Sequence, residues 1–260
     1  DEVIYTEHGF AMYRISAQLR GAVPIKVSET NRIANVDNIL QSCNNKTKII
    51  FLANPNNPTG TFLEISKIKY LLEKLPDNIL IVIDGAYSEY IENFDSGISF
   101  VRNYNNLIVL RTFSKIYGLA SLRIGWSYSS KWISKIINQV RGPFNISSPA
   151  IAAATAAVLD ADYIRHCHVK NLKNREWLTR ELKNLGLSTT NSKANFLLVD
   201  FCSELQANRA FDFLKNHNIY VRKVIDYGLK QSLRITVGTD IDCKLVKKNI
   251  QKFLGLDNEI

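Results

Sequence analysis

Three short motifs in the first half of the chain contain side chains that could do chemistry. They are NPNNPTG at residues 54–60, DGAY at 84–87 and RTFSKIYG at 111–118. Each follows a run rich in Ile, Val and Leu, which is typical of a strand covered on both faces. Ligands of open α/β sheets bind at the carboxyl ends of the strands. The position of the motifs therefore favours a common site.

The first motif places a pair of asparagines between two prolines, Pro55 and Pro58. Proline fixes φ, so the loop can hold a side-chain amide in one direction, from which it can donate to a ligand oxygen. Asn, Pro and Gly are also common turn residues. A rigid loop without a ligand is therefore the alternative interpretation.

In the second motif, Asp84 closes a very apolar run and Tyr87 follows three residues later. A buried carboxylate without a partner is unfavourable, so Asp84 requires one. The partner could be a metal ion or a protonated ring nitrogen. A helix or turn cap would also satisfy the carboxylate.

The third motif contains Lys115 between two hydroxyl residues and a later arginine. Thr112 and Ser114 precede the lysine, and Arg123 lies eight residues after it. A single lysine is more often a solvated surface residue. Together, two hydroxyls, a lysine and an arginine are suited to binding an anion such as phosphate.

The order of these motifs resembles that of the fold-type I aminotransferases, which depend on pyridoxal 5′-phosphate (PLP). The resemblance rests on N-P-x-N-P-T-G, D-x-A-Y and T-x-S-K followed by the arginine. Within that superfamily the chain is most similar to histidinol-phosphate aminotransferases, in the segments 9–22, 194–201, 219–224 and 232–239. Enzymes acting on aromatic amino acids or threonine phosphate share parts of these segments.

The resemblance implies a role for each candidate residue. Lys115 would bind the cofactor aldehyde covalently and move a proton, Asp84 would pair with the protonated pyridine nitrogen, and Tyr87 would assist them. The residues that hold the cofactor would be Phe10, Asn57, Asp84, Tyr87, Thr112, Ser114, Lys115 and Arg123. Phe10 would lie on the ring face, Asn57 and Tyr87 at the phenolic oxygen, and Thr112, Ser114 and Arg123 at the phosphate.

Two arginines near the C-terminus would bind the substrate. The resemblance places Arg234 at the anionic end of the substrate and Arg222 beside it as a second contact. One arginine can accept a carboxylate in one half-reaction and a phosphate in the other. The expected reaction is amino-group transfer between histidinol phosphate and 2-oxoglutarate, in histidine biosynthesis.

Two other functions are kept as alternatives. One is an aminotransferase for aromatic amino acids, in which Arg234 binds the α-carboxylate. The other is an inactive or incomplete aminotransferase, because family members begin upstream of the segment that matches Asp1. We expect residues 1–260 alone to have little activity. The resemblance also implies a homodimer.

Composition argues against several other classes of protein. The chain has a formal net charge of +9, but the basic residues are scattered, which favours a solvated surface over a nucleic-acid site. No apolar run approaches the roughly 20 residues that span a membrane. Four widely separated cysteines favour a reducing compartment, and hence a cytoplasmic location. His166-Cys167-His168 is expected on a helix, where positions i and i+2 diverge, so no metal site is expected.

The motifs require an α/β fold to position them. We expect strands at residues 3–6, 23–27, 48–53, 79–84, 107–111 and 123–128, alternating with helices such as 63–74. This rhythm predicts a three-layer, mainly parallel, doubly wound sheet. After about Pro149 we expect a helix at 150–158, a long helical stretch that follows it through Trp177 to Leu185, and helices at 205–216 and 241–254. Strands are expected at 196–200, 219–221 and 233–237. The expected domains are a large PLP-binding domain, 1–160, and a small α+β domain, 161–260.

Overall fold

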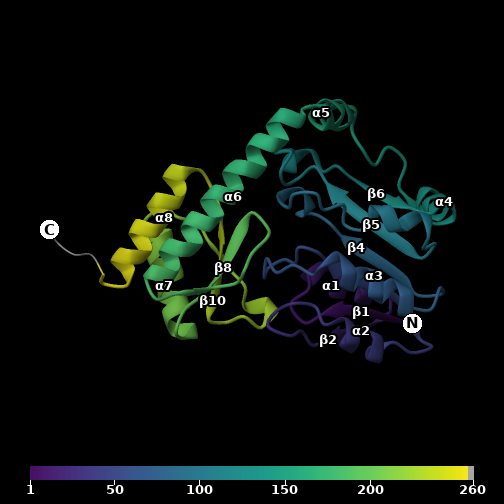
Figure 1. Cartoon of the computed structure of the whole chain (residues 1–260), viewed down its shortest axis with the longest axis horizontal. Helices are drawn as coiled ribbons and strands as arrows, with labels where there is room; N and C mark the ends of the chain where they lie inside the picture. Colours follow the sequence, from purple (N-terminus) through teal and green to yellow (C-terminus); the bar gives the residue numbers. More distant parts are fainter. Residues whose placement is uncertain (257–260) are drawn as a thin grey trace.

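A six-stranded sheet forms the first part of the chain (Figure 1). The computed structural model describes residues 1–256. The strands are β1 (Glu2–Thr6), β2 (Val23–Val27), β3 (Thr47–Ala53), β4 (Leu80–Asp84), β5 (Leu107–Thr112) and β6 (Gly125–Ser129), in the order β2-β1-β3-β4-β5-β6. The first five strands are parallel and β6 is antiparallel to β5. The prediction of a mainly parallel sheet is confirmed.

Helices cover both faces of this sheet and make the three layers. They are α1 (Ala11–Leu19), α2 (Val36–Ser42), α3 (Ile65–Lys74), α4 (Lys131–Val140) and α5 (Ser148–Leu159). Three short 3₁₀ turns accompany them: η1 (Ser88–Tyr90), η2 (Ile98–Arg102) and η3 (Ala120–Leu122). Helices α2 and α3 bury Ile39 and Leu71 against one face. On the other face, Ile133 of α4 packs on Val82 and Tyr13 of α1 stacks on Phe51.

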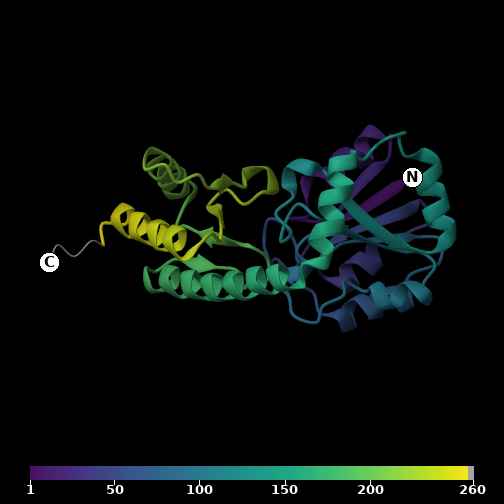
Figure 2. The same cartoon turned by 90° about the horizontal axis from the view of Figure 1, so that it is seen from above.

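A smaller antiparallel sheet forms the second part of the chain (Figure 2). Its strands are β7 (Ser188–Thr189), β8 (Phe196–Asp200), β9 (Arg222–Lys223) and β10 (Ser232–Thr236), in the order β7-β8-β10-β9. Helices α6 (Ala161–Asn184), α7 (Glu204–Asn216) and α8 (Asp240–Phe253) accompany it, with the short turn η4 (Ile225–Tyr227). Leu178, Leu197, Leu214 and Ile250 meet in its core. Helix α8 begins with a capping box formed by Thr239 and Asp242.

Helix α6 connects the two sheets. It begins after its N-cap Asp160, whose side chain accepts a hydrogen bond from the Tyr163 N–H. It then passes η1, where His168 Nδ1 lies 3.1 Å from the Glu89 carbonyl oxygen, and it continues onto the small sheet. The predicted domain boundary at residue 160 falls at the start of this helix and stays a prediction.

Two expectations about strands are wrong. Residues 219–221 are not a strand, because the Ile219 N–H bonds back to Leu214 and ends α7; the pairing begins at Arg222. Strand β6 begins at Gly125 rather than at residue 123, and it is largely exposed rather than covered on both faces. Arg123 has a φ of 52° and makes the turn before this strand.

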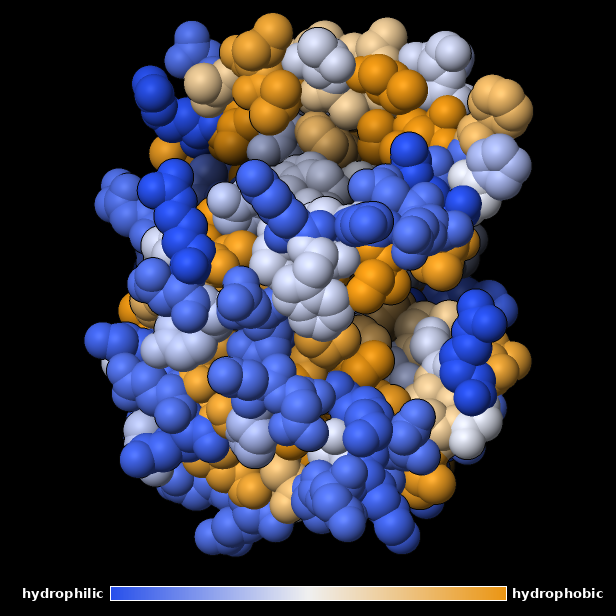
Figure 3. All heavy atoms as spheres, turned by 90° about the vertical axis from the view of Figure 1, so that its right-hand side faces the viewer, coloured by the Kyte–Doolittle hydropathy of each residue, from blue (hydrophilic) through white to orange (hydrophobic). Residues whose placement is uncertain are grey.

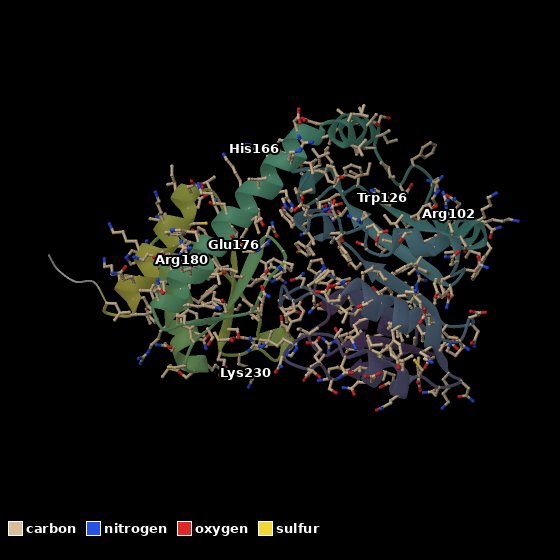
Figure 4. All side chains as sticks on the ribbon, in the orientation of Figure 1. Arg102, Trp126, His166, Glu176, Arg180 and Lys230 are labelled. Carbon is tan, nitrogen blue, oxygen red and sulfur yellow. The ribbon has the colours of Figure 1, made fainter. Side chains whose placement is uncertain are left out.

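No helix within residues 1–256 is long and apolar enough to span a membrane. The same residues contain no group of three or more His, Cys, Asp and Glu arranged to hold a metal ion. His166 lies on α6 with its side chain exposed (Figure 4). Cys43, Cys167, Cys202 and Cys243 are free thiols.

Candidate active site

The three motifs meet in one cavity at the carboxyl ends of β3, β4 and β5. Its volume is about 320 Å³. The residues that line it are Phe10, Tyr13, Ala53, Pro55, Asn57, Asp84, Ala86, Tyr87, Leu110, Arg111, Thr112, Ser114, Lys115 and Arg123. All eight residues that the sequence assigned to the cofactor are among them. The parallel sheet therefore brings together side chains that lie more than a hundred residues apart in the sequence.

The first motif is a rigid loop in which each asparagine has a different task. The Asn54 side-chain amide donates to the Leu63 carbonyl and accepts a hydrogen bond from the Leu63 N–H, each at 2.8 Å. The Asn56 amide donates to the His8 carbonyl and to Thr59 Oγ1. These two buried amides fix the loop, and Asn57 faces the cavity.

Gly60 ends this loop with a φ of +71°. A Cβ there would lie 2.2 Å from Ser192 Oγ, so both the backbone and the small sheet require glycine. The Lys193 N–H donates to the Gly60 carbonyl, and Thr190 Oγ1 donates to the Thr59 carbonyl. The small sheet is thus joined directly to the loop that carries Asn57.

Asp84 lies at the end of β4 with both carboxylate oxygens bonded. Oδ1 accepts the Ala86 N–H at 3.0 Å, and Oδ2 accepts the Tyr13 hydroxyl at 2.7 Å. Burial raises the pKa of Asp84, and these bonds and the charge of Lys115 oppose that rise only in part. A cationic group in the cavity would stabilise the ionised carboxylate.

Lys115 borders the cavity beside Tyr87. Its Nζ lies 5.1 Å from the centre of the Tyr87 ring. Burial lowers the pKa of Lys115, and the charges of Arg234, Arg123 and Arg222 lower it further, while Asp84 acts in the opposite direction. A larger share of the amine is therefore neutral at neutral pH than in an exposed lysine. A neutral amine is the form that attacks an aldehyde or accepts a proton.

The hydroxyls and the arginine of the third motif surround one corner of the cavity. Arg123 Nη1 donates to Ser114 Oγ at 3.3 Å and to the Ala120 carbonyl at 2.7 Å. The Ser114 N–H donates to Thr112 Oγ1 at 3.1 Å. The left-handed turn at Arg123 returns its side chain to the end of β5. Three donors to an anion therefore lie at one place.

Arg222 and Arg234 lie on the small sheet and are not part of the cavity wall. They are opposite each other on β9 and β10. Arg234 reaches the cavity through Asn57, because its Nη1 donates to Asn57 Oδ1 at 2.6 Å. This bond leaves the Asn57 amide hydrogens available to a ligand. Arg234 Nε is buried without a partner, so it has a donor available for an anion.

A second cavity, of about 600 Å³, borders Lys115 on the side of α6 and α8. Its wall includes Tyr90, Asn171, Asn174 and Asn195. Lys115 thus separates two cavities, one at the large sheet and one beside the small sheet. Asn195 lines the second cavity.

Sequence reasoning missed two features of the site. The first is the hydrogen bond from the Tyr13 hydroxyl to Asp84. Its position in the sequence could have indicated it, because Tyr13 lies one helical turn after Phe10 and therefore on the same face. Arg111 lines the cavity and forms a buried pair with Glu89 at 2.9 Å. Nothing in the sequence pairs these two residues, since η1 brings Glu89 to β5.

The model of the family described as "Aminotransferase class I and II" matches residues 1–250 of the chain. The chain is 46% identical to a histidinol-phosphate aminotransferase of Ruegeria sp. (strain TM1040) over 253 residues, which are 97% of this chain and 70% of that protein. A protein of the same name from Dinoroseobacter shibae has the same identity and the same coverage.

Solved structures of similar proteins have the same fold. A histidinol-phosphate aminotransferase of Sinorhizobium meliloti, in complex with pyridoxal-5′-phosphate, superposes with a TM-score of 0.90 at 26% identity. The match covers 98% of this chain and 70% of that one. A histidinol-phosphate aminotransferase of Clostridium acetobutylicum has a TM-score of 0.92 at 21% identity and shares the fold.

Proposed function

Because the chain belongs to the class I and II aminotransferase family, we propose that its cavity binds PLP and that it transfers an amino group between histidinol phosphate and 2-oxoglutarate. The observation that carries this proposal is the meeting of Lys115, Asp84 and the phosphate-type donors in one cavity. Relatives at 46% identity that bear the name histidinol-phosphate aminotransferase support the choice of substrate.

The residues of the cavity fit PLP at each end of the cofactor. Asp84 is a partly buried carboxylate that favours a cation, which a protonated pyridine nitrogen supplies. The donors on Thr112, Ser114 and Arg123 suit a phosphate. When bound, PLP supplies an aldehyde for the amine and a ring that withdraws electrons from the substrate carbon.

Lys115 has two tasks in this proposal. Its Nζ would hold the cofactor through the aldehyde, and its neutral amine would take the proton from the substrate α-carbon. A lowered pKa suits both tasks, because each needs the neutral amine. The Tyr87 ring beside Nζ limits where the amine can move.

Arg234 and Arg222 would bind the anionic end of the substrate. Burial lowers the pKa of Arg234, and an anion at its unpaired Nε would compensate for the lost hydration. Arg222 lies opposite Arg234 on the neighbouring strand β9 and adds a second positive charge. Two arginines suit a doubly charged phosphate better than a single carboxylate.

Removing the Arg222 side chain should therefore weaken the binding of histidinol phosphate more than that of other substrates. Charge-assisted bonds contribute about 1.5–3 kcal/mol each, so kcat/KM for histidinol phosphate should fall roughly ten- to a hundredfold in Arg222→Ala. The kcat/KM for phosphate-free aromatic amino acids should fall much less. Steady-state kinetics of the natural protein and of Arg222→Ala, each with both kinds of substrate, measures this difference.

The matched control is Lys223→Ala, since Lys223 packs its Nζ over the Phe211 ring, 4.5 Å from its centre. It is adjacent to Arg222 on β9, and its loss should leave kcat/KM for both substrates unchanged. An equal loss for the two substrates in Arg222→Ala would contradict the phosphate assignment and favour the aromatic alternative.

We also propose that the protein forms a homodimer through the large sheet. Exposed apolar side chains gather on β6 and α4: Trp126, Tyr128, Trp132, Ile136 and Val140. Hydrophobic residues, in orange, also gather at the top of this side of the molecule, where α5 lies (Figure 3). Trp126 lies on β6, away from the small sheet (Figure 4). A surface of this kind is typical of an interface.

The double variant Ile136→Glu/Val140→Glu should convert the dimer to a monomer, because buried unpaired carboxylates oppose association. Sedimentation velocity of the natural protein and the variant measures this change. Tyr220→Glu is the control, since Tyr220 is exposed on the small part of the chain and should not alter the mass. A variant that still sediments as a dimer would place the interface elsewhere.

A further inference from the structure

Tyr13 is a buried tyrosine of α1 whose hydroxyl reaches the site. Only 6% of its surface is exposed, and its hydroxyl donates to Asp84 Oδ2 at 2.7 Å. The bond joins α1 to the end of β4, across 71 residues of sequence. Tyr13 itself lines the cavity. Its hydroxyl is thus the side-chain donor that fixes one oxygen of the Asp84 carboxylate.

Two aromatic neighbours hold the Tyr13 ring in place. It stacks on Phe51 of β3, with centroids 4.8 Å apart and planes 4° apart. Phe10 contacts it edge to face, with centroids 5.8 Å apart and an interplanar angle of 85°. Aromatic pairs of both kinds are favourable. The ring cannot rotate without losing them, so the position of the hydroxyl is set by β3 and by the start of α1.

The Asp84 carboxylate is consequently held at two points. Oδ2 accepts the Tyr13 hydroxyl and Oδ1 accepts the Ala86 N–H. Each carboxylate oxygen can accept two hydrogen bonds, so both keep a free lone pair. Asp84 also lines the cavity, and a lone pair is therefore available to a group inside it.

We propose that Tyr13 is a positioning residue that keeps the Asp84 carboxylate ionised and directed at the ring nitrogen of a pyridine-type cofactor. The inference rests on the proposed function, since it assigns Tyr13 a task toward the group that Asp84 would bind. Tyr13 acts through Asp84 and touches no reacting atom.

The electrostatics of the pair agree with this task. Burial raises the pKa of Asp84, and the hydrogen bond from Tyr13 is the largest of the effects that oppose it. Burial, and then the charge of Asp84, raise the pKa of Tyr13 well above its usual range. The hydroxyl therefore keeps its proton and serves only as a donor, which stabilises the carboxylate and never competes with it for a cation.

The test is Tyr13→Phe, which removes the hydroxyl and keeps the ring. We expect PLP to bind about tenfold more weakly and the half-reaction with glutamate to slow by about tenfold, because one charge-assisted hydrogen bond is lost. Tyr5→Phe is the control. Tyr5 is a buried tyrosine on β1, and the charge that acts on its hydroxyl is that of Arg14. It should match the natural protein in both measurements.

A second measurement needs no cofactor. Carboxyl carbon NMR of the PLP-free protein, with the Asp84 signal identified by its absence in Asp84→Asn, follows the ionisation of this group. Its midpoint should lie at a higher pH in Tyr13→Phe than in the natural protein, with Lys115, Tyr87 and the Ala86 N–H unchanged around it. An unchanged midpoint would overturn the proposal.

A double-mutant cycle separates positioning from general packing. If Tyr13 acts through Asp84, adding Tyr13→Phe to Asp84→Asn should change PLP affinity by less than twofold, against tenfold in the natural background. Equal effects in both backgrounds would assign Tyr13 a merely structural role. Failure of the natural protein to bind PLP would contradict the proposed function, whereas binding with no effect of Tyr13→Phe would contradict this inference alone.

Discussion

Lys115→Arg is expected to lower the rate of amino transfer by at least about 10⁴-fold, because it removes both the attachment of the cofactor and the base that moves the proton. Arginine keeps the positive charge, so the electrostatics of the cavity change little. Its guanidinium stays protonated at neutral pH and cannot attack an aldehyde. Turnover with histidinol phosphate and 2-oxoglutarate measures the loss.

The same position should carry the covalent label. Borohydride reduction of the natural protein with PLP, followed by peptide mapping, should place the cofactor on Lys115. Lys170→Arg is the control, since Lys170 lines the neighbouring cavity together with Lys115. This variant should retain turnover and label. Label on another lysine, or a Lys115→Arg enzyme that still turns over, would refute the assignment.

Asp84→Asn should have the next largest effect, a fall in kcat of about 10²–10³-fold, because the developing charge loses its fixed electrostatic partner. The neutral amide is nearly the same size, so the loss reports charge rather than shape. A fall in kcat with little change in KM would indicate a role in the reaction itself. A pure rise in KM would instead place Asp84 in substrate binding.

The same substitution should stabilise the PLP-free protein at neutral pH. The folded-state pKa of Asp84 is raised by burial, so its contribution to stability is present below the usual pKa of a carboxyl and is lost as pH rises through the raised pKa. The neutral amide of Asp84→Asn does not ionise, so the variant does not lose this stability as the pH rises. We expect a higher Tm than the natural protein at pH 7, and a gain that disappears on acidification.

Asp95 provides a control of opposite sign. Partial burial raises its pKa, but the Ser99 and Gly97 N–H groups outweigh that effect and lower it. Its contribution is present above the usual pKa and lost in acid. Asp95→Asn should therefore lower the Tm at pH 7. Thermal unfolding of both variants across pH tests the signs, and two variants that shift alike would contradict the assignment.

Local patterns were sufficient to predict most of the fold. Most strands of the large sheet are apolar runs, and their ends were predicted to within two residues because a turn or motif follows each run. The aminotransferase resemblance is confirmed by the family match, since it rested on several motifs in order. Strand β9 was not predictable, because Arg222 and Lys223 become a strand only through pairing with β10.

The parts of the site that sequence could not supply are contacts between distant elements. The bond from Arg234 to Asn57 joins the small sheet to the first motif, and no local pattern reports a contact across 177 residues. The pairing of Tyr13 with Asp84 likewise depends on where α1 lies over β3. Sequence identified the chemical groups, whereas the structure identified which groups hold them in place.

Helix α6 is long enough that a small change in its angle moves its far end appreciably. Its 24 residues, at a rise of about 1.5 Å each, make a rod about 36 Å long. Its first half lies against η1, next to Tyr87, and its second half carries the small sheet with Arg222 and Arg234. A tilt of about 5° at its start would displace its far end by about 3 Å, the length of a hydrogen bond. The reach of the two arginines toward Lys115 thus depends on the angle of α6 together with the bonds that join the small sheet to the first motif. Substitutions far from the cavity that change this angle are therefore a route to altered substrate choice.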